Sequence, residues 1–294
     1  MKSARWCLLL VAAALSGLAA PLFAQQAATS SSLFARVVDD ELGNPGALQM
    51  AIVRYLLPGQ SDVTVDLIGA VHIGDQDYYE QLNRRFQDYD VLLYELIAPP
   101  DTEVPAAGEM PDSFVSNTQM AMRSALGLAF QLEIIDYAAP NFVHADLSPD
   151  ELAAQMQARG ESFYVYFWRA FYAGMSQASK DPLGLRDIEM LASMLSPGRG
   201  DSLKVTMAYE LANFDAVSTM LDGPDGSALI AARNQRAIDV LQSELNDGAL
   251  QVGIFYGVAH MPDMEQRLLE QLGLVPGDTV WVDAWQLGEP VADD

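Results

Sequence analysis

Cysteine is almost absent from this chain of 294 residues. Its one cysteine, Cys7, lies inside an N-terminal stretch with the features of a secretory signal peptide. Once such a peptide is removed no thiol remains, which excludes disulfide bonds, cysteine nucleophiles and cysteine metal ligands. Cys7 does not stand at a cleavage site, so the sequence also argues against a lipid-anchored protein.

The N-terminal stretch combines the usual parts of a signal peptide. Lys2 and Arg5 form a positive start, an apolar run follows, and small residues lead to Ala24, after which we expect cleavage. Residues 1–24 are therefore predicted to be a signal peptide and residues 25–32 a short polar linker. We expect the protein to be secreted across the inner membrane into the periplasm. A retained membrane anchor is the alternative interpretation of the same pattern.

Basic residues are scarce as well. The chain has 16 Lys and Arg against 40 Asp and Glu, a formal net charge of −24 at pH 7. No basic run or stripe interrupts this acidic composition, and such a charge repels phosphate backbones, which argues against nucleic acid as a partner. Beyond the signal peptide no apolar stretch reaches the roughly 18 residues of a membrane span. The sequence therefore predicts neither a nucleic-acid partner nor a membrane span once the signal peptide is removed.

Downstream of the linker, the chain predicts one α/β domain, residues 33–294. Strands are predicted at residues 34–38, 51–56, 63–70, 90–97, 250–258 and 278–285. Helices are predicted at residues 75–85, 117–132, 162–176, 183–195, 203–221, 225–246 and 264–272. The first two strands flank the turn-rich Gly43–Gly46 and predict a β-hairpin, and Ser148–Glu151 has the pattern of a capped helix start. We expect a mixed, largely parallel central sheet formed by both ends of the chain, with a helical insertion at about residues 112–246.

An internal repeat stands out in this pattern. The run Gly69-Ala70-Val71-His72-Ile73-Gly74-Asp75 matches Gly257-Val258-Ala259-His260-Met261-Pro262-Asp263 without gaps. Each run follows an apolar strand and leads into a helix and a second apolar strand, so the chain holds two strand–turn–helix–strand units, at about residues 63–97 and 250–285. Each unit also carries an acid at the same distance after its histidine. Because crossover connections have a fixed hand, we expect each unit to place its two strands as parallel neighbours.

Histidine is rare too, and its distribution is informative. Of the chain's 3 histidines, His72 and His260 occupy the equivalent G-x-x-H turns of the repeat. Ligands of open α/β sheets bind beyond the carboxyl ends of the strands, where both turns should lie. Glu95 closes the first unit near the end of an apolar strand, where an acid is costly to bury unless it is paired, protonated or bound to a metal. We therefore predict a site that joins these three residues. A duplication of the fold without chemistry is the alternative.

Two residues of the predicted long helix complete this candidate site. Arg233 and Asn234 precede the second G-x-x-H unit. Arg233 is a candidate to pair with Glu95 or to bind an anionic group of the substrate, and a surface salt bridge is the alternative. Asn234 is a candidate to orient the substrate or a ligand of the site.

Four further residues have competing interpretations. His144 either points into the cleft or makes a structural hydrogen bond, the role that we favour. Asp283 matches Glu95 in the repeat. It is either a residue that holds a side chain of the site in position or an ordinary surface residue. Asp75 and Asp263 each follow the histidine of a G-x-x-H turn by three residues, and we expect them to cap the following helices rather than to take part in catalysis.

These motifs together resemble those of the TraB/GumN family. The resemblance is carried by Gly69–Asp75, Leu82–Phe86, Leu92–Glu95, Arg233-Asn234 and Gly257–His260. That family is similar to the Tiki metalloproteases and belongs to the wider erythromycin-esterase-like and ChaN-like group. The resemblance extends from Leu33 to Trp285 and implies paired G-x-x-H turns, an acid after the first and an Arg-Asn helix before the second. In the Tiki branch it implies metal-dependent peptide cleavage, so we expect a peptide or small-molecule substrate. This chain departs from the family in its strong acidity, and its middle helices need not match those of the Tiki proteins.

Our leading hypothesis is metal-assisted hydrolysis of peptide bonds. His72 and His260 would be metal ligands, and Glu95 would be a third ligand or the base that takes a proton from bound water. The metal ion would lower the pKa of the water and polarise the scissile carbonyl. Arg233 would stabilise the developing oxyanion, and Asn234 would orient the substrate or a ligand. Mn, Co and Zn all accept such nitrogen and oxygen donors.

Three other functions stay open, and the erythromycin-esterase and ChaN resemblances allow the first two of them. The first is a metal-free esterase-type hydrolase, in which a histidine activates water and Glu95 orients it. The second is a non-enzymatic protein that binds haem or a metal, with the aromatic run Phe163–Trp168 as a wall of the pocket, although such a run is more often plain core. The third is a regulatory peptide-binding protein.

Overall fold

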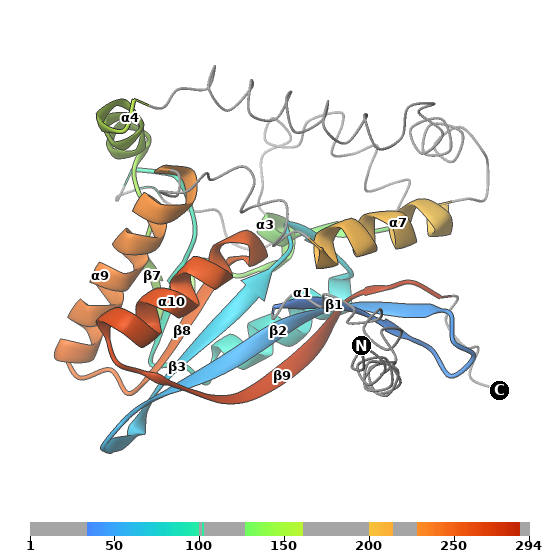
Figure 1. Cartoon of the computed structure of the whole chain (residues 1–294), viewed down its shortest axis with the longest axis horizontal. Coiled ribbons are helices and arrows are strands. Elements are labelled where there is room, and N and C mark those ends of the chain that lie inside the picture. The colour runs from blue at the N-terminus through green and yellow to red at the C-terminus, as the bar shows by residue number, and fades with distance from the viewer. Residues whose placement is uncertain (1–33, 100–101, 103–126, 161–199, 214–227, 289–294) are drawn as a thin grey trace, which may run out of the picture. The chain divides into compact units, whose positions relative to one another are not determined.

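The computed structural model describes residues 34–99, 102, 127–160, 200–213 and 228–288 of the compact unit Ser31–Asp294 (Figure 1). Several predicted segments lie outside these residues. They are the signal peptide 1–24, the linker 25–32, most of the helix 117–132, the helices 162–176 and 183–195 with the aromatic run 163–168, and the second half of the helix 203–221. Within the described residues, no helix combines the length and the apolar character that crossing a membrane requires.

The described elements alternate between strands and helices. The strands are β1 (Ala35–Asp39), β2 (Pro45–Leu57), β3 (Gln60–Ala70), β4 (Ile73–Gly74), β5 (Val91–Tyr94), β6 (Ala129–Phe130), β7 (Phe142–His144), β8 (Gln251–Gly257) and β9 (Val275–Gln286). The α-helices are α1 (Gln76–Phe86), α3 (Gln131–Ile134), α4 (Pro149–Ala158), α7 (Gly200–Ala212), α9 (Arg233–Asn246) and α10 (Met261–Gln271). A π-helical turn, η2 (Ala228–Ala232), precedes α9, and a 3₁₀ turn, η3 (Val258–His260), precedes α10.

The main sheet has 7 strands in the order β1-β2-β3-β8-β5-β7, with β9 also paired to β2. Strands β3, β8, β5 and β7 are parallel, whereas β1, β3 and β9 all run antiparallel to β2. The predicted α/β class with a mixed sheet and a parallel central part is confirmed. The predicted hairpin is confirmed as well, because β1 and β2 pair on either side of the turn at Gly43.

The strands of the two predicted units interleave in this sheet. Strand β8 lies between β3 and β5 and pairs in parallel with both, while β9 joins the distant edge of β2. The expectation that each unit makes parallel neighbours of its own is therefore wrong. Burial explains the arrangement: six of the seven positions of β8 are buried or half-buried on both faces, whereas the first half of β9 is exposed. A strand that is apolar on both faces belongs in the middle of a sheet.

Helices cover both faces of the parallel strands. Helix α1 packs on one face, where the ring of Phe86 lies 4.9 Å from that of Phe255. Helices α9 and α10 lie on the other face (Figure 1), towards which the next residue of β8, Tyr256, points its ring at 5.3 Å from that of His260. Adjacent residues of β8 thus anchor opposite helical layers, as the alternation of side chains along a strand requires.

Local predictions held where the sequence offered a capping or periodic signal. Helix α4 begins with the capping box of Ser148 and Glu151 and with Pro149 in its first turn. The long predicted helix is present from residue 228 onwards, with a π turn before α9. The predicted helix 117–132 is wrong at its described end, because Ala129–Phe130 forms β6 and pairs with β4. This pairing ties the chain to the segment that directly follows His72.

Candidate active site

The two predicted histidines and Glu95 meet around Gly257, at the end of β8. A Cβ atom added to Gly257 would lie 3.2 Å from Oε2 of Glu95 and 3.9 Å from both Nε2 of His72 and Cδ2 of His260. The glycine has an ordinary φ of −52°. It therefore serves to leave space, since any larger residue would place its side chain between the three groups. We call His72, Glu95 and His260 with the open position at Gly257 the Gly257 centre.

The register of the parallel strands builds this centre. Ala70 of β3 pairs with Gly257 of β8, so the two G-x-x-H turns leave the sheet side by side. The ladder between β5 and β8 continues past Tyr94, because the N–H of Glu95 donates to the carbonyl of Phe255 over 3.2 Å. Each group of the centre thus lies just beyond the carboxyl end of a parallel strand, as expected of ligand sites in such sheets.

Glu95 is held by two donors. Its Oε2 accepts the N–H of Gly257 at 2.6 Å, and its Oε1 accepts Nη2 of Arg233 at 2.7 Å. Burial acts to raise the pKa of Glu95, but the charges of His260 and Arg233 and the N–H of Gly257 together lower it to about 2. The carboxylate is therefore ionised at neutral pH.

Arg233 is enclosed by acids, so the surface salt bridge that the sequence left open is not what forms. Its Nε and Nη2 donate to the two oxygens of Asp146 at 2.9 and 2.6 Å, in addition to the bond with Glu95. Burial acts to lower the pKa of Arg233, but the hydrogen bond to Asp146 and the charge of Glu95 raise it overall. Two carboxylates against one guanidinium leave this cluster with a net negative charge.

Asp146 was missed by the sequence analysis. Its side chain is fully buried, and it follows β7, the fourth parallel strand. The signal that could have found it is the one that pointed to Glu95, namely an acid just beyond an apolar strand. Strand β7 spans only 3 residues, and its pattern was too short to predict a strand.

His260 is buried and held by Asn234. Its Nδ1 lies 2.6 Å from Oδ1 of Asn234, and its backbone carbonyl accepts Nδ2 of the same amide at 3.0 Å. Burial lowers the pKa of His260 to about 4, and the charge of Glu95 offsets only part of that shift. The ring is therefore neutral at pH 7. Its Nε2 lies 3.4 Å from Nη1 of Arg233 and 3.6 Å from Oε1 of Glu95.

His72 occupies the equivalent turn but has a different environment. Its side chain is exposed, and within the part of the chain that the structure describes no residue hydrogen-bonds to its ring. Its backbone carbonyl accepts the N–H of Gln131 at 3.0 Å, which holds the turn against α3. The repeat thus places one fixed, buried histidine and one solvent-facing histidine at the same centre.

The secondary candidates lie away from the centre. Nε2 of His144 is 2.6 Å from the carbonyl of Leu96, in line with the structural role that we favoured. Asp283 is exposed and accepts Nε2 of Gln49 at 2.6 Å, because β9 joins the sheet at β2 and carries Asp283 away from Glu95. The structure therefore does not bring Asp283 to the site.

The expected helix caps are wrong for both aspartates. Asp75 stands at the start of α1, but its carboxylate binds Nζ of Lys204 at 3.1 Å and the N–H of Gln286 at 2.5 Å. Asp263 lies inside α10, because η3 runs into that helix and starts it earlier than predicted. Its carboxylate accepts Nδ2 of Asn234 at 2.8 Å and Nε of Arg267 at 2.6 Å.

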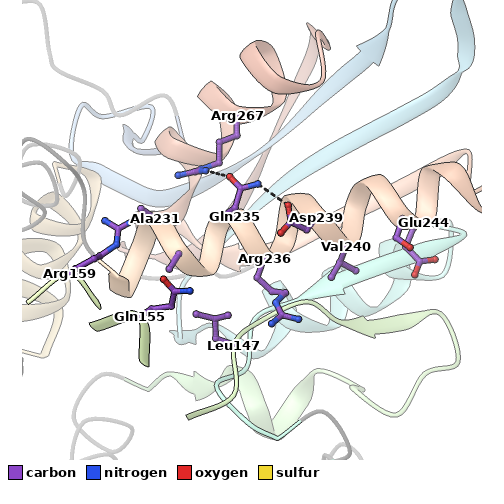
Figure 2. A pocket seen from close by; sticks show the side chains of 12 residues that line it. Leu147, Gln155, Arg159, Ala231, Gln235, Arg236, Asp239, Val240, Glu244 and Arg267 are labelled. Carbon is purple, nitrogen blue, oxygen red and sulfur yellow. Dashed lines mark hydrogen bonds between the residues drawn. The ribbon is translucent and has the colours of Figure 1, made fainter. Parts of the chain in front are cut away.

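A separate polar pocket of about 570 Å³ lies between α4 and the outer side of α9 (Figure 2). Arg236 and Gln155 point into it, and Gln235 bridges Arg267 and Asp239 along its wall. No residue of the Gly257 centre lines this pocket. The pocket is therefore distinct from the candidate active site.

Comparisons of the chain with protein-family models, with curated proteins and with solved structures find no match. The similarity to the TraB/GumN family therefore remains a prediction from the motifs. Within the described residues, no group of three or more His, Cys, Asp or Glu side chains lies in an arrangement that could hold a metal ion. What the geometry establishes is a cluster of two histidines, an ionised carboxylate and a buried arginine around one open position.

Proposed function

We propose that this chain is a secreted metal-dependent hydrolase that cleaves peptide bonds at the Gly257 centre. The observation that carries the proposal is the convergence of the two G-x-x-H histidines, at 3.9 Å, and of Glu95, at 3.2 Å, on the open position at Gly257. These groups come from parts of the chain far apart in sequence. A duplicated fold without chemistry does not require two histidines and an ionised acid to face one gap.

The donors suit a divalent ion such as Mn, Co or Zn. Nε2 of His260 and Oε1 of Glu95 lie 3.6 Å apart, near the separation of about 3.4 Å that follows for two ligands of one tetrahedral ion from the usual bond lengths. The net negative charge of Glu95, Asp146 and Arg233 favours a cation. His72 would be the third donor, since its exposed ring has no hydrogen bond to any described residue and can turn towards Glu95.

A bound ion would lower the pKa of a coordinated water and polarise the scissile carbonyl. The chain's own residues would do the rest. Glu95, with a pKa of about 2, is a weak base, so we assign it to holding the ion rather than to taking a proton. His260 would present a neutral nitrogen. Arg233 would supply positive charge to the developing oxyanion, and Asn234 would hold the His260 ring rather than the substrate.

We extend the proposal to the origin of the fold. The order β3–α1–β5 is repeated as β8–α10–β9, with a G-x-x-H turn after the first strand of each set. We propose that residues 63–97 and 250–285 are two copies of one unit and that about 112–246 is a helical insertion between them. Together with the Arg-Asn pair of α9, this supports membership of the TraB/GumN family.

One observation favours a second candidate, a metal-free esterase-type hydrolase. Nη1 of Arg233 lies 3.4 Å from Nε2 of His260, so a fixed positive charge already faces the nitrogen that would bind a metal. In this alternative, the solvent-facing His72 would be the base that activates water. Arg233 would then stabilise the oxyanion without a metal.

Elemental analysis and a peptide-library assay test the proposal together. Protein purified without chelator or affinity tag should carry one transition metal per chain, and chelation should stop hydrolysis until Mn, Co or Zn is added back. Glu95→Gln should remove both the metal and the activity. The matched control is Asp283→Asn, which alters the equivalent acid of the repeat on the surface and should change neither. Activity that survives exhaustive chelation would establish the metal-free alternative, and no hydrolysis of peptides with any added metal would refute the metal-dependent peptidase.

A further inference from the structure

We propose that Asp263 is a positioning residue that sets, through the amide of Asn234, which ring nitrogen of His260 carries the proton. The inference deepens the proposed function, on which its catalytic consequence rests. The tautomer of His260 is itself a property of the substrate-free protein. Asp263 was expected only to cap a helix, and the structure gives it a different set of partners.

The first step is the orientation of the Asn234 amide. One end of this fully buried amide faces Oδ2 of Asp263 at 2.8 Å and the backbone carbonyl of His260 at 3.0 Å. A carbonyl oxygen only accepts hydrogen bonds, and so does a carboxylate that is paired with a guanidinium. The end of the amide that faces both must therefore be the NH₂ group. The carboxylate of Asp263 is held in place by Nε and Nη2 of Arg267, at 2.6 and 3.2 Å.

The second step passes from the amide to the ring. With its NH₂ group turned to Asp263, Asn234 presents Oδ1 to His260, 2.6 Å from Nδ1. An amide oxygen accepts but cannot donate, so Nδ1 must carry the hydrogen. Because a neutral imidazole has only one N–H, Nε2 is left with a free lone pair. That nitrogen is the one that faces Glu95 and Arg233.

The third step is the consequence for the centre. If the Asn234 amide turned over, its NH₂ group would donate to Nδ1 and the ring proton would move to Nε2. His260 could then neither bind a cation through Nε2 nor accept a hydrogen bond there. Groups that fix the tautomer of a metal-binding histidine in this way typically change metal affinity or activity by about 10- to 100-fold when they are altered.

The two halves of the repeat differ in this device. Asp75 occupies the position that matches Asp263, but it binds Lys204 and the backbone of Gln286. Among the described residues, no amide connects Asp75 to the ring of His72. The Asp–Asn–His relay therefore belongs to His260 alone, which accounts for one fixed and one solvent-facing histidine at the same centre.

Nitrogen NMR of the chelated, substrate-free protein tests the inference directly. The chain has only 3 histidines, so selective ¹⁵N-histidine labelling gives few signals, and His72→Gln and His144→Gln assign them. The wild-type protein should show His260 as a single tautomer with the proton on Nδ1. Asp263→Asn should populate the Nε2–H tautomer in part, because its own amide can present oxygen or NH₂ to Asn234, while the His260 carbonyl still favours the wild-type orientation. Asp263→Glu, which keeps a carboxylate, should restore the wild-type tautomer.

Two further variants sharpen the test. Asp247→Asn alters an exposed aspartate at the C-terminal end of α9, away from the relay and from the Asp239–Gln235–Arg267 contacts, and should leave the His260 signals unchanged. The double variant Asn234→Asp with Asp263→Asn offers only acceptor oxygens to Nδ1 and should keep the Nδ1–H tautomer although Asp263 is gone. If Asp263→Asn does not fold, the wild-type spectrum still decides, because an Nε2–H tautomer of His260 there would contradict the relay.

The outcomes separate this inference from the proposed function. A wild-type tautomer in Asp263→Asn, or an Nε2–H tautomer in the wild-type or the double variant, would overturn the relay. A shifted tautomer in Asp263→Asn supports it, whether or not the protein hydrolyses peptides. If the protein is a hydrolase, Asp263→Asn should also lower its metal affinity or activity by about 10- to 100-fold, and Asp263→Glu should recover most of the loss.

Discussion

Gly257 and Glu95 are joined by a hydrogen bond of 2.6 Å from the backbone N–H of the glycine to Oε2, and a Cβ atom on Gly257 would lie 3.2 Å from that same oxygen. The glycine thus supplies both a donor and an empty position. The first function survives substitution by alanine, because the backbone N–H remains. The second does not, since a methyl group would lie against the carboxylate and point between the two histidines.

Gly257→Ala should therefore impair activity more than stability. Its backbone angle is one that alanine adopts, so we expect the free energy of unfolding to change by no more than about 1 kcal/mol. Hydrolysis and metal binding should fall at least 10-fold, because the methyl group occupies the space of a ligand or water. Parallel urea titrations and kinetic assays measure the two effects.

The matched control is Gly69→Ala in the first unit of the repeat. A Cβ atom there would meet the Ala51 carbonyl oxygen and the side chains of Met261 and Val258 at 3.6 Å, which is ordinary contact. It would not enter the gap between the histidines. Equal losses of activity in both variants would contradict a special role for the space at Gly257.

The site could be predicted from the sequence where the repeat and the rarity of histidine carried the signal. His72, His260, Glu95, Arg233 and Asn234 converge, because each of them flanks a strand or helix whose apolar pattern was visible. The strand order could not be predicted in the same way. The handedness of crossovers fixes how consecutive strands connect, but burial decides which strand lies in the centre of the sheet. Strand β8 therefore pairs with β3, where β5 was expected.

The roles of the aspartates were harder to predict for a related reason. Asp75 and Asp263 stand where capping residues stand, but Asp75 binds the distant Lys204 and Gln286. Asp263 binds the distant Asn234 as well as Arg267 in its own helix. A local sequence pattern contains no information about such long-range partners. The matching position of Asp283 likewise indicated nothing about its surroundings on β9.

Asp146→Ala should be among the most destabilising single changes in the chain. It removes the bidentate partner of the buried Arg233 and leaves that guanidinium with Glu95 as its remaining carboxylate. Breaking one side of a buried ion pair costs about 3–5 kcal/mol. Urea unfolding measures the loss, and the exposed Asp239→Ala on the same helical layer should cost less than about 1 kcal/mol. A small effect of Asp146→Ala would show that Arg233 does not depend on it.

Gly253→Ala tests the central position of β8 independently of the site. A Cβ atom there would lie 2.5 Å from Cδ1 of Leu92 and 3.1 Å from Cδ1 of Ile68, in the middle of the sheet. We expect a loss of about 1–3 kcal/mol of folding free energy from overpacking. The double variant with Leu92→Ala should cost less than the two single losses together, because the shorter side chain makes room for the methyl group. Additive losses would indicate that β8 is packed differently.

The pH dependence of stability should reveal the buried state of His260. Its pKa is lowered from 6.5 to about 4 in the folded chain. Between these values the unfolded chain binds a proton that the folded chain does not, so stability is fully present above pH 6.5 and is lost as the pH falls towards 4, by up to about 1.4 kcal/mol per pH unit. Glu95 adds a loss of stability at lower pH, from 4.5 down to about 2, because its pKa is also lowered in the folded chain.

In chelated protein, His260→Gln should flatten the upper part of the curve of stability against pH, whereas Glu95→Gln should act mainly on the lower part. An unchanged slope between pH 6.5 and 4 in His260→Gln would mean that folding does not lower the pKa of His260.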